Sequence, residues 1–193
     1  VLYSMVKNSR PTRAEISDAA NAIFDHTDAI MLSNETAVGK HPVRSTTTLT
    51  KVASSVEKEM QNHKELLETL NPAKKYMSAI DATCLNVCEL AIDTKADYII
   101  TYTEEGYTAK IIAKYRPRIP IITVCSNKKV AQQLTLVWGL NKIHESKQIS
   151  KAKDKVKAIT DFLLKRKAIK KGDKIVVICN ANKKERIIST SRI

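Results

Sequence analysis

The sequence has no long apolar run. Its longest uninterrupted apolar stretches are four or five residues, whereas a membrane-spanning helix needs about 20. Near its start there is no basic segment followed by an apolar one, so nothing indicates a secretory leader. The prediction is a protein with no membrane partner.

Cysteine pairs with the spacing of zinc or redox motifs are also missing. The four cysteines stand at positions 84, 88, 125 and 179, and no two of them form a Cys-x-x-Cys pair. Cys84 and Cys88 are four apart in a helix-like segment, and Cys125 and Cys179 end strand-like runs. We interpret all four as buried free thiols in a reducing compartment, which predicts a cytoplasmic protein without a metal site.

The sequence is basic but lacks the aromatic residues that accompany nucleic-acid binding. It carries 33 Lys and Arg against 20 Asp and Glu, a net charge of +13. Residues 141–193 hold 16 of the basic and 5 of the acidic residues, or +11. No aromatic side chains are interleaved there for base stacking, and the alternating lysines at 151, 153, 155 and 157 would spread around the polar side of a helix. We interpret the charge as a solvated face, with a basic nucleic-acid-binding domain as the weaker alternative.

The length and composition fit one complete domain plus part of another. The sequence has 193 residues, of which 43% are apolar and 27% charged. The segment around Asn71-Pro72 has the composition of a connection between domains, and the pattern restarts after it. We therefore expect a first part at 1–62, a linker at 63–76 and a second domain at 77–193.

The first part has the pattern helix, strand, polar loop, helix. Thr12 and Glu15 form a capping-box pattern, which predicts a helix from there to about residue 25. The apolar run 29–32 predicts a buried strand, and a Ser/Thr-rich helix is expected over about 43–62. This order is typical of the last units of a larger parallel α/β array, so we expect the chain to be a fragment whose first part is poorly packed alone.

The second part predicts a compact α/β domain. Expected helices lie at 77–94, 108–115, 127–138 and 151–168, and expected strands at 98–100, 120–125, 141–145, 174–179 and 185–193. Three glycines, Gly106, Gly139 and Gly172, fall at turns between these elements. The expected fold is a sheet of about five strands with helices on both faces, its last two strands paired as an antiparallel hairpin.

Several motifs resemble those of one enzyme family. Residues 31–37, Met-Leu-Ser-Asn-Glu-Thr-Ala, resemble the Met-Leu-Ser-Gly-Glu-Thr-Ala signature of pyruvate kinases, and residues 10–15 and 18–22 resemble the landmark before it. In the second part the similar stretches are 101–120, Val137-Trp138-Gly139-Leu140 and Lys171-Gly172-Asp173. The resemblance covers essentially the whole chain. It implies the end of a TIM (β/α)8 barrel followed by the family's complete C-terminal domain.

The resemblance implies an enzyme that moves a phosphoryl group from phosphoenolpyruvate to ADP with Mg²⁺ and K⁺. In the family the metal ligands, the catalytic lysine and a substrate-side threonine lie before Val1, so the isolated chain is expected to be inactive. Ser33 and Glu35 are the candidates for contact with the active site, because they follow a barrel strand at its C-terminal end. In one reading Ser33 bonds near the substrate and Glu35 orients basic groups. In the other they shape the loop, Glu35 favouring the next helix's N-terminus.

Two departures from the family signature stand beside these candidates. Asn34 replaces the usual glycine, which asparagine tolerates if the position is left-handed. His26 also replaces a common glycine, and we assign it no catalytic role. Arg13 and Asp18 lie in the helix that packs between subunits in related enzymes. The resemblance implies an interface role for them, in a tetramer, and solvation at the surface is the alternative.

A second candidate site corresponds to the family's effector loop. Family members that respond to sugar phosphates cradle a phosphate in Thr-x-Ser-Gly-x-Ser before a helix. The matching residues are Thr103, Glu104, Glu105, Gly106, Tyr107 and Thr108. Glu105 replaces a serine and would repel phosphate, and the stretch at 180–185 lacks the glycine-rich closing loop, although Lys183 and Lys184 could supply charge. We expect the effector site to be lost or altered, and a non-catalytic effector-binding module is the alternative function.

Overall fold

The computed structural model describes residues 1–60, 77–180 and 186–193. The chain divides into two compact units, Val1–Asn62 and His63–Ile193, and each is described by itself. The expected linker at 63–76 lies outside the described residues. No described helix is long and apolar enough to cross a membrane.

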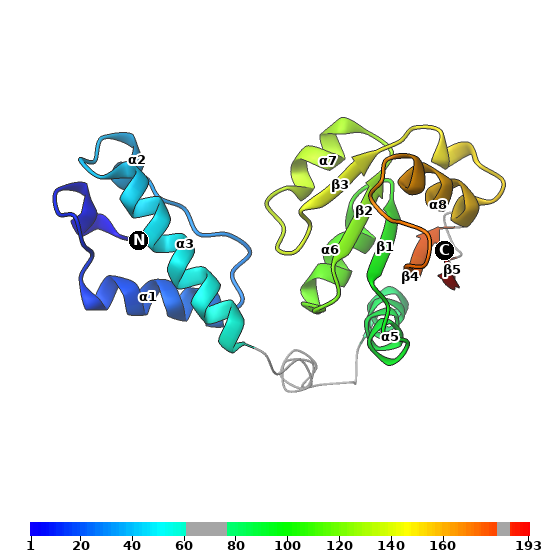
Figure 1. Cartoon of the computed structure of the whole chain (residues 1–193), viewed down its shortest axis with the longest axis horizontal. Coiled ribbons are helices and arrows are strands. Elements are labelled where there is room, and N and C mark those ends of the chain that lie inside the picture. The colour runs from blue at the N-terminus through cyan, green and yellow to red at the C-terminus, as the bar shows by residue number, and fades with distance from the viewer. Residues whose placement is uncertain (61–76, 181–185) are drawn as a thin grey trace. The chain divides into compact units, whose positions relative to one another are not determined.

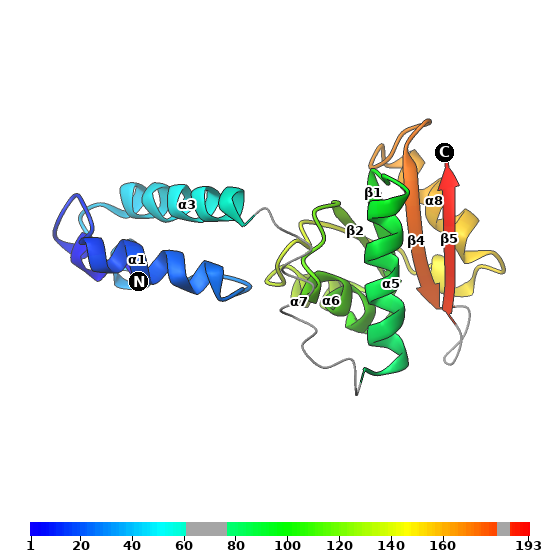
Figure 2. The same cartoon turned by 90° about the horizontal axis from the view of Figure 1, so that it is seen from below.

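The first unit is helical (Figure 1). Its elements are η1 (Tyr3–Val6), α1 (Arg13–Phe24), α2 (Asn34–Ala37) and α3 (Pro42–Glu59). Helices α1 and α3 lie side by side (Figures 1 and 2). The two segments before and after α1 pack on them, so that Leu2, Met5, Ala19 and Leu49 form a small buried core. The predicted helices are confirmed, with α3 ending at Glu59.

The predicted strand at 29–32 is wrong. These residues form no strand or bridge, Ile30 and Leu32 lie partly buried against the small core, and Met31 is 73% exposed. A strand exists only where a neighbouring strand accepts and donates its main-chain hydrogen bonds. No described residue of this unit supplies such a neighbour, so an apolar run that reads as a barrel strand is an irregular segment here.

The second unit is a five-stranded sheet between helices. Its elements are α5 (Ala79–Asp93), β1 (Tyr98–Thr103), α6 (Tyr107–Lys114), β2 (Ile121–Cys125), α7 (Lys128–Leu134), β3 (Lys142–Glu145), η3 (Ile149–Lys151), α8 (Lys155–Lys165), β4 (Lys174–Asn180) and β5 (Arg186–Arg192). The strand order is β3-β2-β1-β4-β5. The first four strands are parallel, and β5 runs antiparallel to β4 (Figure 2). The predicted antiparallel pairing of the last two strands is confirmed.

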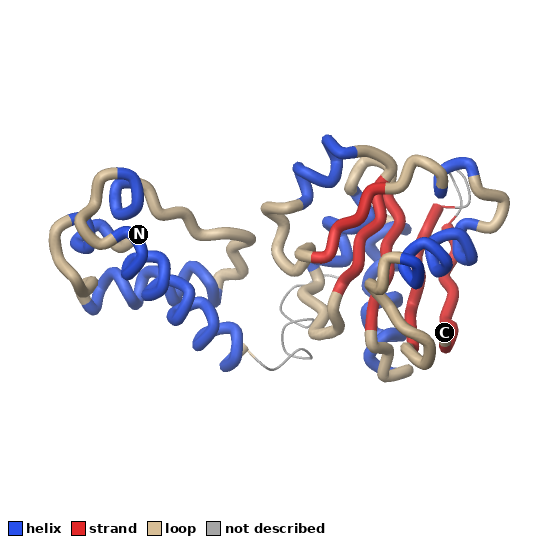
Figure 3. The backbone as a smooth tube through the Cα atoms, turned by 45° about the horizontal axis from the view of Figure 1, so that its top comes forward, coloured by secondary structure: helices blue, strands red, loops and turns tan. Residues whose placement is uncertain are grey.

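Helices cover both faces of this sheet, as predicted (Figure 3). Side chains alternate along each strand, so Ile99 packs with α5, α6 and α7 on one face, while Ile100 packs with α8 on the other. The strands β1, β2 and β4 are buried along nearly their whole length, as strands covered on both faces should be. All four cysteines are buried, and none of them forms a disulfide.

Two helices are shorter than the sequence pattern indicates. Helix α8 begins at Lys155 rather than 151, because the Asp154 side chain accepts a hydrogen bond from the Lys157 main-chain nitrogen at 2.9 Å and caps the helix there. Helix α7 ends at Leu134, well before residue 138. The parallel strands β1, β2 and β3 are followed in the chain by α6, α7 and α8, and all four parallel strands, β4 included, end at the same edge of the sheet.

Candidate functional site

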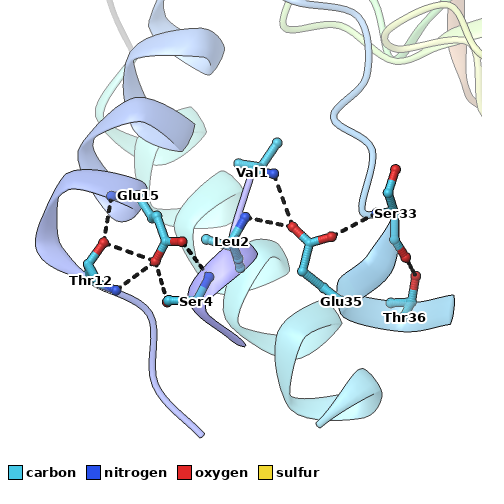
Figure 4. A network of polar contacts seen from close by, with 8 residues as sticks. All are labelled: Val1, Leu2, Ser4, Thr12, Glu15, Ser33, Glu35 and Thr36. Atoms are coloured by element: carbon cyan, nitrogen blue, oxygen red, sulfur yellow. Dashed lines mark hydrogen bonds and ion pairs between the residues drawn. The ribbon is translucent and has the colours of Figure 1, made fainter. Parts of the chain in front are cut away.

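Glu35 is a buried acidic side chain of the first unit that makes several hydrogen bonds. It lies on α2 and is 2% exposed. One carboxylate oxygen, Oε1, accepts hydrogen bonds from the Leu2 main-chain nitrogen at 2.8 Å and from the terminal ammonium of Val1 at 3.0 Å. The other, Oε2, accepts from the Ser33 main-chain nitrogen at 2.9 Å (Figure 4). The carboxylate therefore joins two segments that are far apart in the sequence.

These donors decide the charge state of Glu35. Burial alone would raise the pKa of its carboxyl, but hydrogen bonds from the main-chain nitrogen of Glu35 itself, the terminal ammonium of Val1 and the main-chain nitrogens of Ser33 and Leu2 outweigh burial and lower the pKa to about 2. Among the described residues, the groups that contact the carboxylate are the amide nitrogens of Leu2 and Ser33 and the terminal ammonium of Val1, which forms an ion pair with it. Glu35 is therefore ionised, and its carboxylate binds main-chain nitrogens of two segments.

Ser33, the other candidate in this loop, is exposed and immediately precedes α2. Its side chain does not cap the helix, and its carbonyl oxygen accepts a hydrogen bond from the Thr36 hydroxyl at 3.2 Å (Figure 4). The next residue, Asn34, is the first of α2 and does not have a left-handed backbone, so asparagine fits this position without that conformation. His26 does have one, with φ of 63°, which explains why glycine suits that position.

Glu15 forms a second carboxylate anchor beside the first. The predicted capping box with Thr12 is present: the Thr12 hydroxyl accepts from the Glu15 nitrogen, and the Glu15 carboxylate accepts from the Thr12 nitrogen. The same carboxylate also accepts hydrogen bonds from the main-chain nitrogen of Ser4, at 2.7 Å, and from its hydroxyl. Burial opposes ionisation, but the bonds from Ser4 and Thr12 lower the pKa of Glu15 to about 2. The link to Ser4 has no signal in the sequence.

Arg13 and Asp18 are both exposed on α1. No ion pair joins them within the described residues, which agrees with their unfavourable spacing of five along one helix. Both side chains thus lie on a solvent-facing part of the unit.

The loop that resembles an effector site lies at the carboxyl edge of the sheet, between β1 and α6. Gly106 caps α6 with φ of 87°, a left-handed conformation that favours glycine. Its main-chain nitrogen, which would otherwise point toward an anion, donates to the Thr103 hydroxyl at 2.9 Å. Thr103 and Thr108 are buried, whereas Glu104 and Glu105 are exposed. The loop thus uses one of its own donors internally and presents two carboxylates to solvent. Lys183 and Lys184 lie outside the described residues.

A buried lysine at the same edge was missed from the sequence. The Lys155 ammonium donates to the Asn180 carbonyl oxygen at 2.7 Å and lies 5.7 Å from the centre of the Tyr102 ring. Lys155 is only 9% exposed and Tyr102 is fully buried. Burial raises the pKa of the Tyr102 hydroxyl, and Glu104 adds to the rise. The alternating lysines give no sign of which one points inward, because that depends on where α8 begins.

Two family models match the chain, in sequence order. The model described as "Pyruvate kinase, barrel domain" matches residues 1–46, and the model described as "Pyruvate kinase, alpha/beta domain" matches residues 81–193. The second match alone covers more than half of the chain.

Curated relatives are similar along most of the chain. A pyruvate kinase of Clostridium acetobutylicum is 43% identical over 177 residues, which make up 92% of this chain and 37% of that protein. A pyruvate kinase of Geobacillus stearothermophilus is 38% identical over 177 residues, 92% of this chain and 30% of that protein. The chain thus spans less than two fifths of the length of these relatives.

Solved structures share the fold. A crystal structure of a pyruvate kinase from Cryptosporidium parvum matches with a TM-score of 0.82 and 31% identity, covering 99% of this chain and 38% of that one. A Cryptosporidium parvum pyruvate kinase in complex with ADP matches with a TM-score of 0.76 and 30% identity, covering 99% of this chain and 39% of the other.

Proposed function

This chain belongs to the pyruvate kinase family, and from that premise we propose that it is one part of a longer enzyme that transfers a phosphoryl group from phosphoenolpyruvate to ADP, giving pyruvate and ATP. The observation that carries the proposal is the order of the two family matches on one chain, the barrel domain at 1–46 and the alpha/beta domain at 81–193. A separate effector-binding module or a nucleic-acid-binding domain would not explain a barrel segment placed before the α/β domain.

Within that enzyme we assign the loop at 33–36 to the edge of the active site. Loops that follow barrel strands carry the working groups of barrel enzymes. Ser33 offers an exposed hydroxyl there, while Glu35 is buried and bonded to main-chain nitrogens. Ser33 is therefore the residue that approaches the substrate, and Glu35 supports the loop.

The family resemblance implies Mg²⁺ and K⁺, and the described residues do not offer a group of ligands that fits the divalent ion. A divalent cation would neutralise charge on the transferred phosphoryl group and needs carboxylate ligands. Among the described residues no three His, Cys, Asp or Glu side chains form a group that could hold a metal ion. The buried carboxylate of Glu35 accepts hydrogen bonds from main-chain nitrogens. We assign both ions to parts of the longer enzyme outside this chain, and we expect the chain alone to be inactive.

For the second unit we propose an altered effector loop that does not hold a sugar phosphate. The support is the internal bond between Gly106 and Thr103 together with the exposed carboxylates of Glu104 and Glu105. Arg13 and Asp18 are assigned to a contact between subunits of a tetramer, on the basis of their exposure on α1 and of the resemblance. The proposed location is the cytoplasm, in keeping with four cysteines of which none forms a disulfide.

The coding sequence that precedes Val1 tests the assignment directly. We expect it to encode a lysine and a pair of acidic residues able to hold a divalent cation, in a continuous reading frame with this chain. A stop codon, or an unrelated domain, at that place would contradict the proposal.

A further inference from the structure

We propose that Glu35 is a positioning residue: its carboxylate fixes the Ser33 loop against the Val1–Leu2 segment and so sets where the Ser33 hydroxyl stands during the reaction. This inference rests on the proposed function. The observation that supports it is that the two oxygens of one buried carboxylate accept hydrogen bonds from two different segments.

Each oxygen of the Glu35 carboxylate binds a different segment. Oε1 accepts from the Leu2 main-chain nitrogen and Oε2 accepts from the Ser33 main-chain nitrogen, so the two segments are held by one rigid, planar group. The Leu2 and Glu35 positions are separated by 33 along the chain. A local turn or helix therefore cannot replace this link, and removing the carboxylate would leave the Ser33 nitrogen and the Leu2 nitrogen without their acceptor.

The Val1–Leu2 segment is itself fixed. Leu2 and Met5 are fully buried in the core of the unit. Two residues further along, the main-chain nitrogen and hydroxyl of Ser4 are held by Glu15, which is anchored to Thr12 (Figure 4). Carboxylates from two separate helices thus hold both ends of the stretch 1–4. Because the stretch 1–4 is held in place, its bond to Glu35 can fix the position of the Ser33 loop.

The Ser33 loop needs such support. Helix α2 has four residues, and the Ser33 side chain makes no capping bond to it. A single turn of helix is not stable by itself. The apolar run before Ser33 forms no strand in the described unit, and Met31 is mostly exposed. The direct anchor at the start of the loop is the bond from the Ser33 nitrogen to Glu35.

Glu35 acts through Ser33 and does not itself react. Its side chain is almost fully buried, and both of its oxygens are occupied by main-chain donors. The hydrogen bonds from the Ser33 and Leu2 main-chain nitrogens also lower the pKa of this carboxyl, so it stays ionised at neutral pH and does not exchange a proton during turnover. A group that only holds a loop should change the turnover rate without changing how that rate depends on pH.

The test uses the longer enzyme with the substitutions Glu35→Gln and Glu35→Asp, and Glu59→Gln as the matched control, since Glu59 is an exposed glutamate of the same unit. We expect Glu35→Gln to lower kcat about tenfold or more with little change in KM, because small misplacements of reacting groups cost up to about 100-fold. Glu35→Asp, which keeps the charge, should recover part of the rate. The pH profile of kcat should keep its wild-type shape.

Two kinetic results would overturn the inference. One is a Glu35→Gln enzyme whose kcat stays within about twofold of the control, which would show that the link does not affect the reaction. The other is a shift of the acidic or basic limb of the pH profile, which would make Glu35 a proton-transfer group.

Amide hydrogen exchange, measured on this chain, tests the link that Glu35 makes between the two segments independently of the proposed function. We expect the Leu2 and Ser33 amides to be protected in the wild type, and both to exchange about tenfold faster in Glu35→Gln, while the Ser4 amide, held by Glu15, changes little. Equal exchange rates of the Leu2 and Ser33 amides in the wild type and in Glu35→Gln would refute this link. Loss of protection at both, together with a wild-type longer enzyme that forms no pyruvate, would instead refute the proposed function. If Glu35→Gln does not fold, Glu35→Asp and the wild-type protection pattern still decide the question.

Discussion

The Oε1 atom of Glu35 lies 2.8 Å from the main-chain nitrogen of Leu2, although the two residues are 33 positions apart. Both are almost completely buried, so the bond forms in a region that excludes water. Ser33, directly before α2, is bound to the same carboxylate from the other side. Glu35, which belongs to the family motif, therefore binds main-chain groups. Its measurable effects should be on stability and on the position of its neighbours.

The acid sensitivity of the first unit should come from Glu35 and Glu15 together, since the pKa of each carboxyl is lowered to about 2. For Glu35 the folded-state pKa of about 2 lies below the ordinary value of 4.5, so the stability gained from the ionised form is complete above pH 4.5 and is lost as the pH falls toward 2. Glu35→Gln should cost about 1–3 kcal/mol at pH 7 and flatten the fall in stability between pH 4.5 and 2. Urea unfolding followed at several pH values measures both effects. Equal slopes for wild type and Glu35→Gln in this range would contradict the account.

The capping box gives a second prediction. Thr12→Ala should destabilise α1 by about 1 kcal/mol, because the Glu15 nitrogen loses its acceptor and the Glu15 carboxylate loses the Thr12 hydroxyl. The matched control is Thr46→Ala, since the Thr46 hydroxyl only bonds back to the Pro42 carbonyl within α3. Thermal unfolding of the two variants compares them. A control that loses as much stability as Thr12→Ala would argue against the cap.

Lys155 gives a third prediction, in the second unit. Lys155→Met keeps the aliphatic part of the side chain but leaves the Asn180 carbonyl without the ammonium donor, at a cost of about 1–3 kcal/mol. Lys157→Met, two residues further along on the exposed side of α8, should change the free energy of unfolding by less than about 0.5 kcal/mol. Chemical denaturation measures the free energy of unfolding of Lys155→Met and Lys157→Met. Equal effects would contradict the inward placement of Lys155.

The altered effector loop gives a fourth prediction. Fructose 1,6-bisphosphate, ribose 5-phosphate and AMP should leave the melting temperature of the chain unchanged at millimolar concentration. Glu105→Ser removes one exposed carboxylate from the loop and should strengthen binding of such anions by about fivefold, the value of one like-charge contact near 4 Å in water. Titration calorimetry with inorganic phosphate measures the difference. Stabilisation of the wild-type chain by any of the three compounds would contradict the proposed loss of the site.

The features that the sequence predicts well are those set by neighbouring residues. The capping box needs only Thr12 and Glu15, three apart, and the β4–β5 hairpin follows from two apolar runs separated by a short link. The run at 29–32 fails as a strand because pairing depends on residues elsewhere in a barrel. Short apolar runs, typical of strands covered on both faces, made the sheet of the second unit predictable.

The candidate site was only partly predictable for the same reason. A polar loop after an apolar run marks Ser33 and Glu35 from sequence, but the bond from Leu2 to Glu35 spans 33 positions and leaves no local pattern. The Ser4–Glu15 bond is likewise set by how η1 packs against α1. Lys155 is one of several alternating lysines, and only the start of α8 at Asp154 determines that it is the buried one.

The most direct measurement of the central proposal is pyruvate formation from phosphoenolpyruvate and ADP with Mg²⁺ and K⁺ present, assayed for residues 1–193 alone and for the longer protein that contains them. The account predicts sustained turnover by the longer protein and none above background by the chain alone, since no described group of its residues could hold a metal ion. Turnover by the chain alone, or a longer protein that forms no pyruvate, would contradict it.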